Sequence, residues 1–140
     1  MLPCRAVKAA HYVMAAALAA SVPFISIAKG DASEQESARQ AVARTPVEWQ
    51  ALWKAHSPDQ TPPVVDFASR MVVGVFLGTK PTSGYDVEIV SVQTDGDALV
   101  VQYRQRQPAR DMMTAQILTQ PYHLIAVPSH ADPVRFVEVK

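Results

Sequence analysis

A series of apolar runs in the middle of the chain constrains its fold more than any other feature. Met71–Leu77 is apolar on both alternating faces, which indicates a strand covered on both sides. Tyr85–Ile89 alternates apolar residues with acids, as a half-buried strand does. Asp95-Gly96 then predicts a tight hairpin turn into Leu99–Tyr103. Because the connections are too short for a helical crossover, the sheet should be largely antiparallel.

Further short runs extend this β pattern. The expected additional strands are Thr114–Thr119, Tyr122–Val127 and a terminal strand within 134–139. The apolar set changes face between Val90 and Val92, which predicts a bulge. We therefore expect a mainly β (α+β) fold, with one N-terminal helix packed on an antiparallel sandwich or small barrel of about six strands.

The helix has a sharp start. Thr45-Pro46-Val47-Glu48 combines a capping threonine, a first-turn proline and a glutamate that can reach back. A single apolar stripe follows, and Ser57-Pro58 ends the helix. The stripe is Trp49, Leu52, Trp53 and His56. The residues expected in the core are Trp49, Leu52, Trp53, Val73 and Tyr103. His56 lies at the helix C-terminus, where the helix dipole favours its charged form.

The N-terminal region resembles an export leader. Arg5 and Lys8 precede a run of small and apolar residues, and Ser26-Ile27-Ala28 offers small side chains where a signal peptidase reads them. We predict a signal peptide over 1–28, cut before Lys29, a polar linker over 29–44 and a β domain over 45–140. The protein would then be periplasmic or secreted, with no membrane attachment after cleavage.

Composition excludes several functions. The only cysteine, Cys4, would leave with the leader, so the remaining chain would have no disulfide and no thiolate chemistry. Loss of Arg5 and Lys8 takes two from the 13 basic residues and leaves the 13 acidic residues unchanged, which argues against nucleic-acid binding. Phosphate-cradling glycine loops are absent, and we expect no cofactor.

Candidate catalytic and metal groups are isolated in the sequence. Ser83 with His123 and Asp86 or Asp111 makes a nominal triad, but the Gly-x-Ser-x-Gly frame is missing. The histidines have no partner at metal-ligand spacing, and His130-Ala131-Asp132 is the nearest cluster. We therefore expect no enzyme and no metal, with a hydrolase using Ser83 as the rival from another class.

The turn between the two central strands is the best candidate for a contact site. Pro81 and Gly84 define a fixed turn that presents polar groups. It is either a stiff hairpin connection or a pre-ordered contact loop. The candidate partner-binding residues are Lys80, Thr82, Ser83, Gly84 and Tyr85. Arginines at 104, 106 and 110 form a solvated basic set that can also hold an acidic partner.

Four short motifs together resemble the PrcB C-terminal domain family. They are Trp49-x-x-x-Trp53, Val65-Asp66-Phe67, Gly78-x-x-Pro81-Thr82-x-Gly84-Tyr85 and Leu118-Thr119-x-Pro121-Tyr122. The resemblance runs from about Trp49 to Val137. It implies a small bacterial envelope domain related to an accessory subunit of an extracellular protease complex, with no catalytic residues to carry over.

A second resemblance concerns one loop. Lys80–Tyr85 is similar to the Pro-Thr-Thr-Gly-Tyr loop of chagasin-type inhibitors of cysteine proteases, but the other two inhibitory loops are missing. The leading hypothesis is a non-enzymatic exported domain that binds a protein, such as a protease. The alternatives are a chagasin-like inhibitor and a domain that binds a small ligand in a cavity beside Gly74 and the tryptophans.

Overall fold

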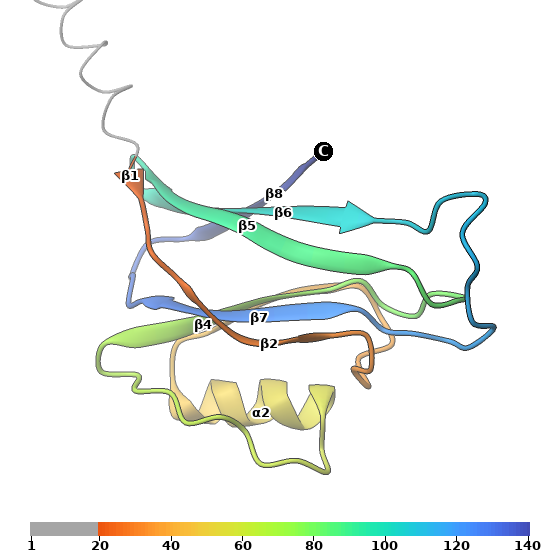
Figure 1. Ribbon diagram of the computed structural model, residues 1–140. Coiled ribbons are helices and arrows are strands. Elements are labelled where there is room, and N and C mark those ends of the chain that lie inside the picture. Colours follow the sequence, from red (N-terminus) through yellow and green to blue (C-terminus); the bar gives the residue numbers. More distant parts are fainter. Residues whose placement is uncertain (1–19) are drawn as a thin grey trace, which may run out of the picture.

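Within residues 20–140, two four-stranded sheets and one helix form three layers (Figure 1). The computed structural model describes residues 20–140. One sheet has the order β1-β5-β6-β8, and the other has the order β2-β7-β4-β3. The first sheet contains β1 (Ala20–Ser21), β5 (Asp86–Asp95), β6 (Ala98–Arg106) and β8 (Val134–Val139). The second contains β2 (Ile25–Gly30), β3 (Arg39–Ala43), β4 (Arg70–Phe76) and β7 (Tyr122–Pro128).

This architecture confirms the expected fold class and decides for a sandwich over a closed barrel. Helix α2 (Pro46–His56) covers the outer face of the β2-β7-β4-β3 sheet (Figure 1). The described residues contain eight strands, more than the six expected. All strand pairs are antiparallel except β6 with β8, which run parallel because the chain crosses to the other sheet through β7 between them.

The core has two parts, one on each face of β4. Met71, Val73 and Val75 belong to the cluster between the two sheets. Val72 and Phe76 belong to the cluster beneath α2. The apolar residues on both alternating faces of this strand therefore reflect burial on both sides.

Helix α2 is capped as its sequence predicts. The hydroxyl of Thr45 accepts a hydrogen bond from the amide of Glu48 (3.1 Å), and the Glu48 carboxylate accepts one from the amide of Arg44 (2.7 Å). The indole N–H groups of Trp49 and Trp53 donate to carbonyls of the segment that follows the helix. All five residues expected in the core are buried.

The hairpin of β5 and β6 is the predicted one. Asp95 pairs with Ala98, and Gly96 has φ 64° in the turn between them. The register shifts between Ile89 and Ser91, which is the predicted bulge.

Three boundaries differ from the sequence-based expectation. Arg39–Ala43 is strand β3, with Ala41 and Ala43 buried beneath α2, so the expected linker over 29–44 is wrong there. Small side chains suffice at these positions because the tryptophans fill the space above them. Residues 20–28 of the expected leader lie in or between β1 and β2, whereas residues 1–19 lie outside the described part.

The third difference is at Thr114–Thr119, which forms no strand. Only Thr119 makes an isolated bridge, with Lys80. Its apolar residues point to solvent and not into a core. No helix between residues 20 and 140 has the length and apolar character needed to cross a membrane.

Candidate functional site

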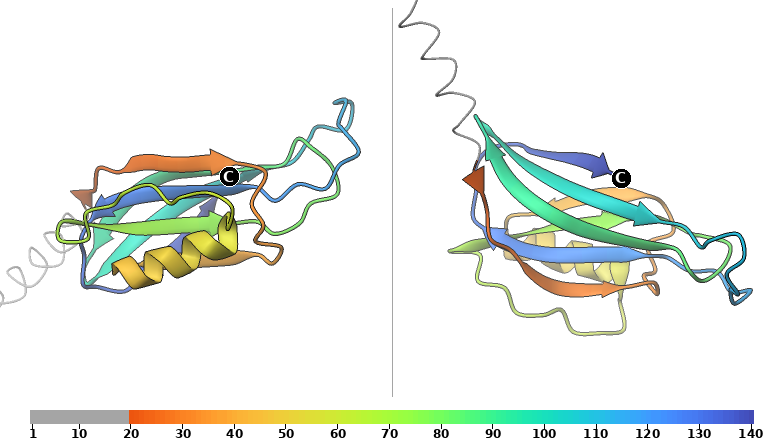
Figure 2. Two further views of the ribbon diagram at one scale, coloured as in Figure 1. Left: turned by 90° about the horizontal axis from the view of Figure 1, so that it is seen from below. Right: turned by 45° about the horizontal axis from the view of Figure 1, so that its top comes forward.

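Two connections project beyond one end of the sandwich, on the right in Figure 1 and again in both views of Figure 2. One is the support turn, residues 78–85, between β4 and β5. The other is the tip loop, residues 107–118, between β6 and β7. Both follow the ends of strands in different sheets, and the projection is the part of the molecule farthest from α2 along the strands.

Hydrogen bonds join the support turn to the C-terminal part of the tip loop and to Thr119, which directly follows it. Lys80 and Thr119 exchange both amide–carbonyl bonds, at 2.7 and 3.0 Å. Ser83 and Ala115 are joined twice. The amide of Ser83 donates to the Ala115 carbonyl (3.1 Å), and the Ser83 hydroxyl accepts from the Ala115 amide (2.8 Å). The Thr119 hydroxyl also donates to the Thr82 carbonyl (2.9 Å). The turn therefore holds the tip loop in place.

Two glycines allow the turn to approach its neighbours. Gly84 has φ 95°, and a Cβ placed there would lie 2.8 Å from the Cβ of Pro108 in the tip loop. Gly78 has φ 78°, and its added Cβ would meet the Ala38 amide nitrogen at 2.8 Å. Larger residues are excluded at both positions by conformation and by space.

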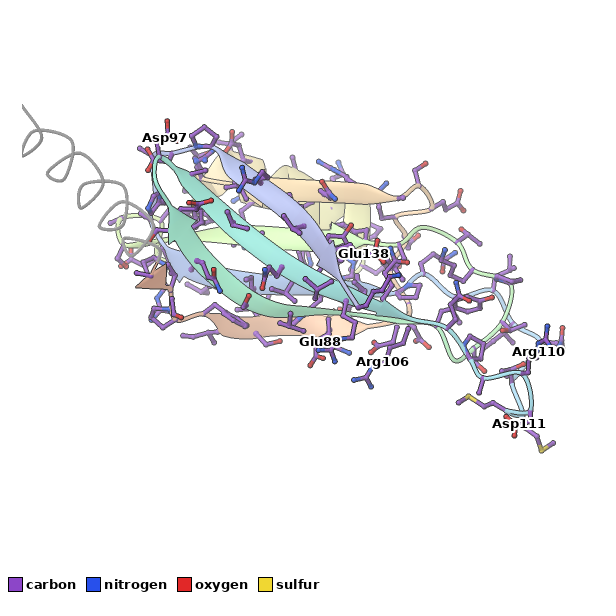
Figure 3. The ribbon with its side chains drawn as sticks, turned by 90° about the horizontal axis from the view of Figure 1, so that it is seen from above. Glu88, Asp97, Arg106, Arg110, Asp111 and Glu138 are labelled. Atoms are coloured by element: carbon purple, nitrogen blue, oxygen red, sulfur yellow. The ribbon has the colours of Figure 1, made fainter. Side chains whose placement is uncertain are left out.

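Exposed apolar side chains gather on the tip loop. Among residues 20–140 seven large apolar residues are exposed, and four of them are in this loop. These four are Met112 (52% exposed), Met113 (97%), Ile117 (57%) and Leu118 (68%). Figure 3 shows sulfur atoms beside Asp111 at the outer end of the projection. Such a concentration of exposed apolar groups is typical of an interaction site.

Charged groups surround this apolar tip. Arg106 and Arg110 are exposed, and both lie toward the projecting end in Figure 3. Lys80 is half-buried, with its ammonium 5.7 Å from the centre of the Tyr85 ring. Asp111 is the acidic residue of the tip loop. Within the tip loop Arg110 and Asp111 balance in charge, and Lys80 and Arg106 add positive charge at the base of the projection, where Arg106 pairs with Asp86 across the sheet.

The structure places the five predicted contact residues in the support turn. Thr82 and Ser83 are half-buried and make hydrogen bonds through their hydroxyl groups within the projection. The Ser83 hydroxyl thus holds the tip loop, whereas the Thr82 hydroxyl donates to the Ser83 carbonyl within the turn. Sequence reasoning missed the exposed residues of the tip because it assigned residues 114–119 to a strand and gave Met112 and Met113 no role. The adjacent pairs Met112-Met113 and Ile117-Leu118, within an otherwise polar stretch after Pro108, were the available signal.

The hypothetical serine triad is not assembled. Both ring nitrogens of His123 bond elsewhere: Nδ1 accepts from the Ile89 amide (2.9 Å), and Nε2 lies 2.8 Å from the Ser26 hydroxyl. Because Nδ1 accepts, the proton of the neutral ring is on Nε2 and is donated to Ser26. Burial, followed by the nearby charge of Lys29, lowers the pKa of His123. This histidine connects the two sheets.

His56 is also structural. Its Nδ1 lies 2.8 Å from the hydroxyl of buried Ser33, and its ring contacts Trp53 and Tyr122. Burial lowers the pKa of His56. Desolvation in the aromatic cluster thus opposes the effect of the helix dipole at His56.

The other candidate sites are closed or incomplete. His130 and Asp132 approach to 3.4 Å without a hydrogen bond. The described residues hold no group of three potential metal ligands. A Cβ at Gly74 would lie 2.4 Å from a methyl of Leu124, so side chains fill the space where a ligand cavity was considered.

A family model described as PrcB C-terminal matches residues 71–128. The match confirms the resemblance over a narrower range than the expected Trp49 to Val137. It covers β4 to β7, and therefore both the support turn and the tip loop. Over this segment the sandwich is similar to the PrcB C-terminal family. Comparisons with curated proteins and with solved structures find no significant match.

Proposed function

We propose that this chain is an exported, non-enzymatic domain that binds a protein partner through the tip loop, as an accessory subunit or modulator of a protease. The observation that carries the proposal is the rigidly supported projection with its exposed apolar end. The match to the PrcB C-terminal family supports the association with a protease complex. The matched residues include both the support turn and the tip loop.

The support turn makes the tip suitable for binding. A flexible loop loses conformational freedom on binding, at roughly 0.5–1.5 kcal/mol for each immobilised side chain. The two bonds between Ser83 and Ala115 hold the backbone of the tip loop before any partner arrives, and the bonds of Lys80 and Thr82 fix Thr119 directly after the loop. The remaining freedom is mainly that of the methionine side chains, which adapt readily to different surfaces.

The partner's chemistry follows from the tip. It should present an apolar pocket or groove for Met113 and Leu118, with acidic groups at the rim opposite Arg106 and Arg110. Burying one such apolar side chain contributes about 1.5–3 kcal/mol. A membrane surface is a poorer occupant, because the tip has no aromatic residue and Asp111 lies beside its apolar end.

Site-specific photo-crosslinking tests this proposal in cells that produce the full-length chain. A photoreactive residue replaces either Met113, which is 97% exposed, or Val64, which is 100% exposed and follows α2. We expect a discrete protein adduct from position 113 and none from position 64. Equal labelling from both positions, or adducts of lipid alone from position 113, would contradict the proposal.

The crosslinked product also tests the association with a protease. Mass spectrometry of the adduct should identify a protease or another subunit of its complex. An Arg110→Ala variant carrying the crosslinker at position 113 should give less adduct, because it removes a charge at the rim. An adduct with an unrelated protein would support binding through the tip loop but would refute the association with a protease.

A further inference from the structure

We propose that signal peptidase cuts this chain between Ala19 and Ala20, so that the processed protein begins with β1. This inference rests on the export proposed above and not on the binding role of the tip. It replaces the cut before Lys29 that the sequence favoured.

The sequence contains two sites with small residues at the positions that the peptidase reads. One is Ser26-Ile27-Ala28, before Lys29, and the other is Ala17-Leu18-Ala19, before Ala20. Both follow the basic residues Arg5 and Lys8. The structure of the segment between them distinguishes the two cuts.

The segment between the two sites is part of both sheets. Ala20 and Ser21 pair with Thr94 and Gln93 of β5. The amide of Val22 then donates to the Val92 carbonyl (2.8 Å). The chain crosses to the other sheet, where β2 pairs with β7 from Ile25 to Gly30.

Side chains of the same segment contribute to both cores. Val22 and Phe24 pack against the cluster between the sheets, and Ile27 and Ala28 pack against the cluster beneath α2. The hydroxyl of Ser26 is the hydrogen-bond partner of His123 Nε2.

A cut before Lys29 would remove all of these contacts. It would leave only Lys29 and Gly30 of β2 and would expose the edge of β7, which is otherwise paired there. His123 would lose its Nε2 acceptor in a buried position. A cut before Ala20 retains every one of these contacts, and the new amino group lies at the exposed end of β1.

The reaction is a peptide hydrolysis. The bond between the carbonyl carbon of Ala19 and the nitrogen of Ala20 breaks. Water supplies the hydroxyl that completes the Ala19 carboxyl group and the proton that completes the Ala20 amine. No other reactant is needed.

The test is N-terminal sequencing and intact mass of the protein exported by a bacterial host that expresses the full-length chain. We expect the exported protein to begin Ala20-Ser21-Val22. A chain that begins at Lys29, or an uncut chain in the cytoplasm, would overturn the inference. The crosslinking experiment scores adducts from position 113 against position 64 and not the position of the cut, so the binding role is tested separately.

Two matched variants make the assignment specific. Ala19→Asp places a charge where the peptidase requires a small residue, and at least a tenfold decrease in processed protein is expected. Ala28→Val blocks the alternative site with an apolar residue suited to a strand, and it should leave the Ala20 terminus unchanged. Normal processing of Ala19→Asp together with loss of processing in Ala28→Val would refute the proposal.

Discussion

The support turn holds the tip loop by close approach at Gly84, and replacing this glycine by alanine tests that contact. Gly84 has φ 95°, a conformation that alanine adopts at a cost of about 1–2 kcal/mol. The added methyl would also lie 2.8 Å from the Cβ of Pro108, inside normal contact distance. Gly84→Ala therefore both strains the turn and pushes the two loops apart.

Gly96 provides the matched control. It also has a positive φ, of 64°, but a Cβ there meets nothing within 4 Å. Gly96→Ala should cost only the conformational term of about 1–2 kcal/mol. Gly84→Ala should cost this and about 1–3 kcal/mol more for overpacking against Pro108. The difference between the two variants contains the contact between the loops, and hydrogen exchange assigns it to that place.

Urea denaturation of both variants measures this difference directly. Hydrogen exchange at the Ser83 and Ala115 amides shows where the effect lies, and exchange should become faster in Gly84→Ala and stay unchanged in Gly96→Ala. Equal losses of stability in the two variants, with no change in exchange at these amides, would refute the account of the turn as a support.

Three further perturbations have defined outcomes. Folding lowers the pKa values of His123 and His56, so these histidines bind protons more tightly in the unfolded chain. The free energy of unfolding should therefore be highest above the unfolded pKa of about 6.5 and should decrease as the pH falls below it. His123→Asn should reduce that slope in denaturation measured from pH 7 to pH 5, and an unchanged slope would contradict the role of His123. Trp53→Ala should cost about 3–5 kcal/mol by thermal unfolding because the indole is buried beneath α2, whereas exposed Val64→Ala should change stability by less than about 0.5 kcal/mol. Lys29→Ala removes a partly exposed ion pair and should cost at most about 1 kcal/mol in the same assay, a larger loss indicating that the strand itself was disturbed.

Local patterns predicted much of the central fold. Alternation along β5, the Asp95-Gly96 turn and the cap at Thr45 depend on neighbouring residues, so they are visible in the sequence. The apolar character of β4 on both faces also predicted its burial between two layers. These features specify most of the β4-to-β7 segment, apart from its projecting loop.

The remaining features depend on partners that are distant in the sequence. Arg39–Ala43 has little apolar content, and it forms a strand because β4 and the tryptophans of α2 bury its two alanines. Small apolar residues after Ala20 resemble a leader, but their pairing with β5 and β7 makes them part of the sandwich. Amino-acid composition alone does not distinguish a leader from strands of the sandwich.

The sequence predicted only one of the two parts of the candidate site, the support turn. The support turn is marked by proline and glycine, which control local conformation. The tip loop contains Ile117 and Leu118, which look like strand residues until the hydrogen bonds of Ala115 and Thr119 to the support turn are known. Those bonds use backbone groups that no residue type reveals.

The affinity of the partner recovered from the position-113 crosslink tests the central claim most directly. Isothermal titration would compare the processed protein with Met113→Asp and Val64→Asp, two substitutions at almost fully exposed sites. If the partner buries the Met113 side chain, its loss should cost about 2 kcal/mol of binding free energy. This predicts roughly 30-fold weaker binding for Met113→Asp, whereas Val64→Asp should bind as the unsubstituted protein does. Equal affinities for all three proteins would contradict the assignment of the tip loop as the contact surface.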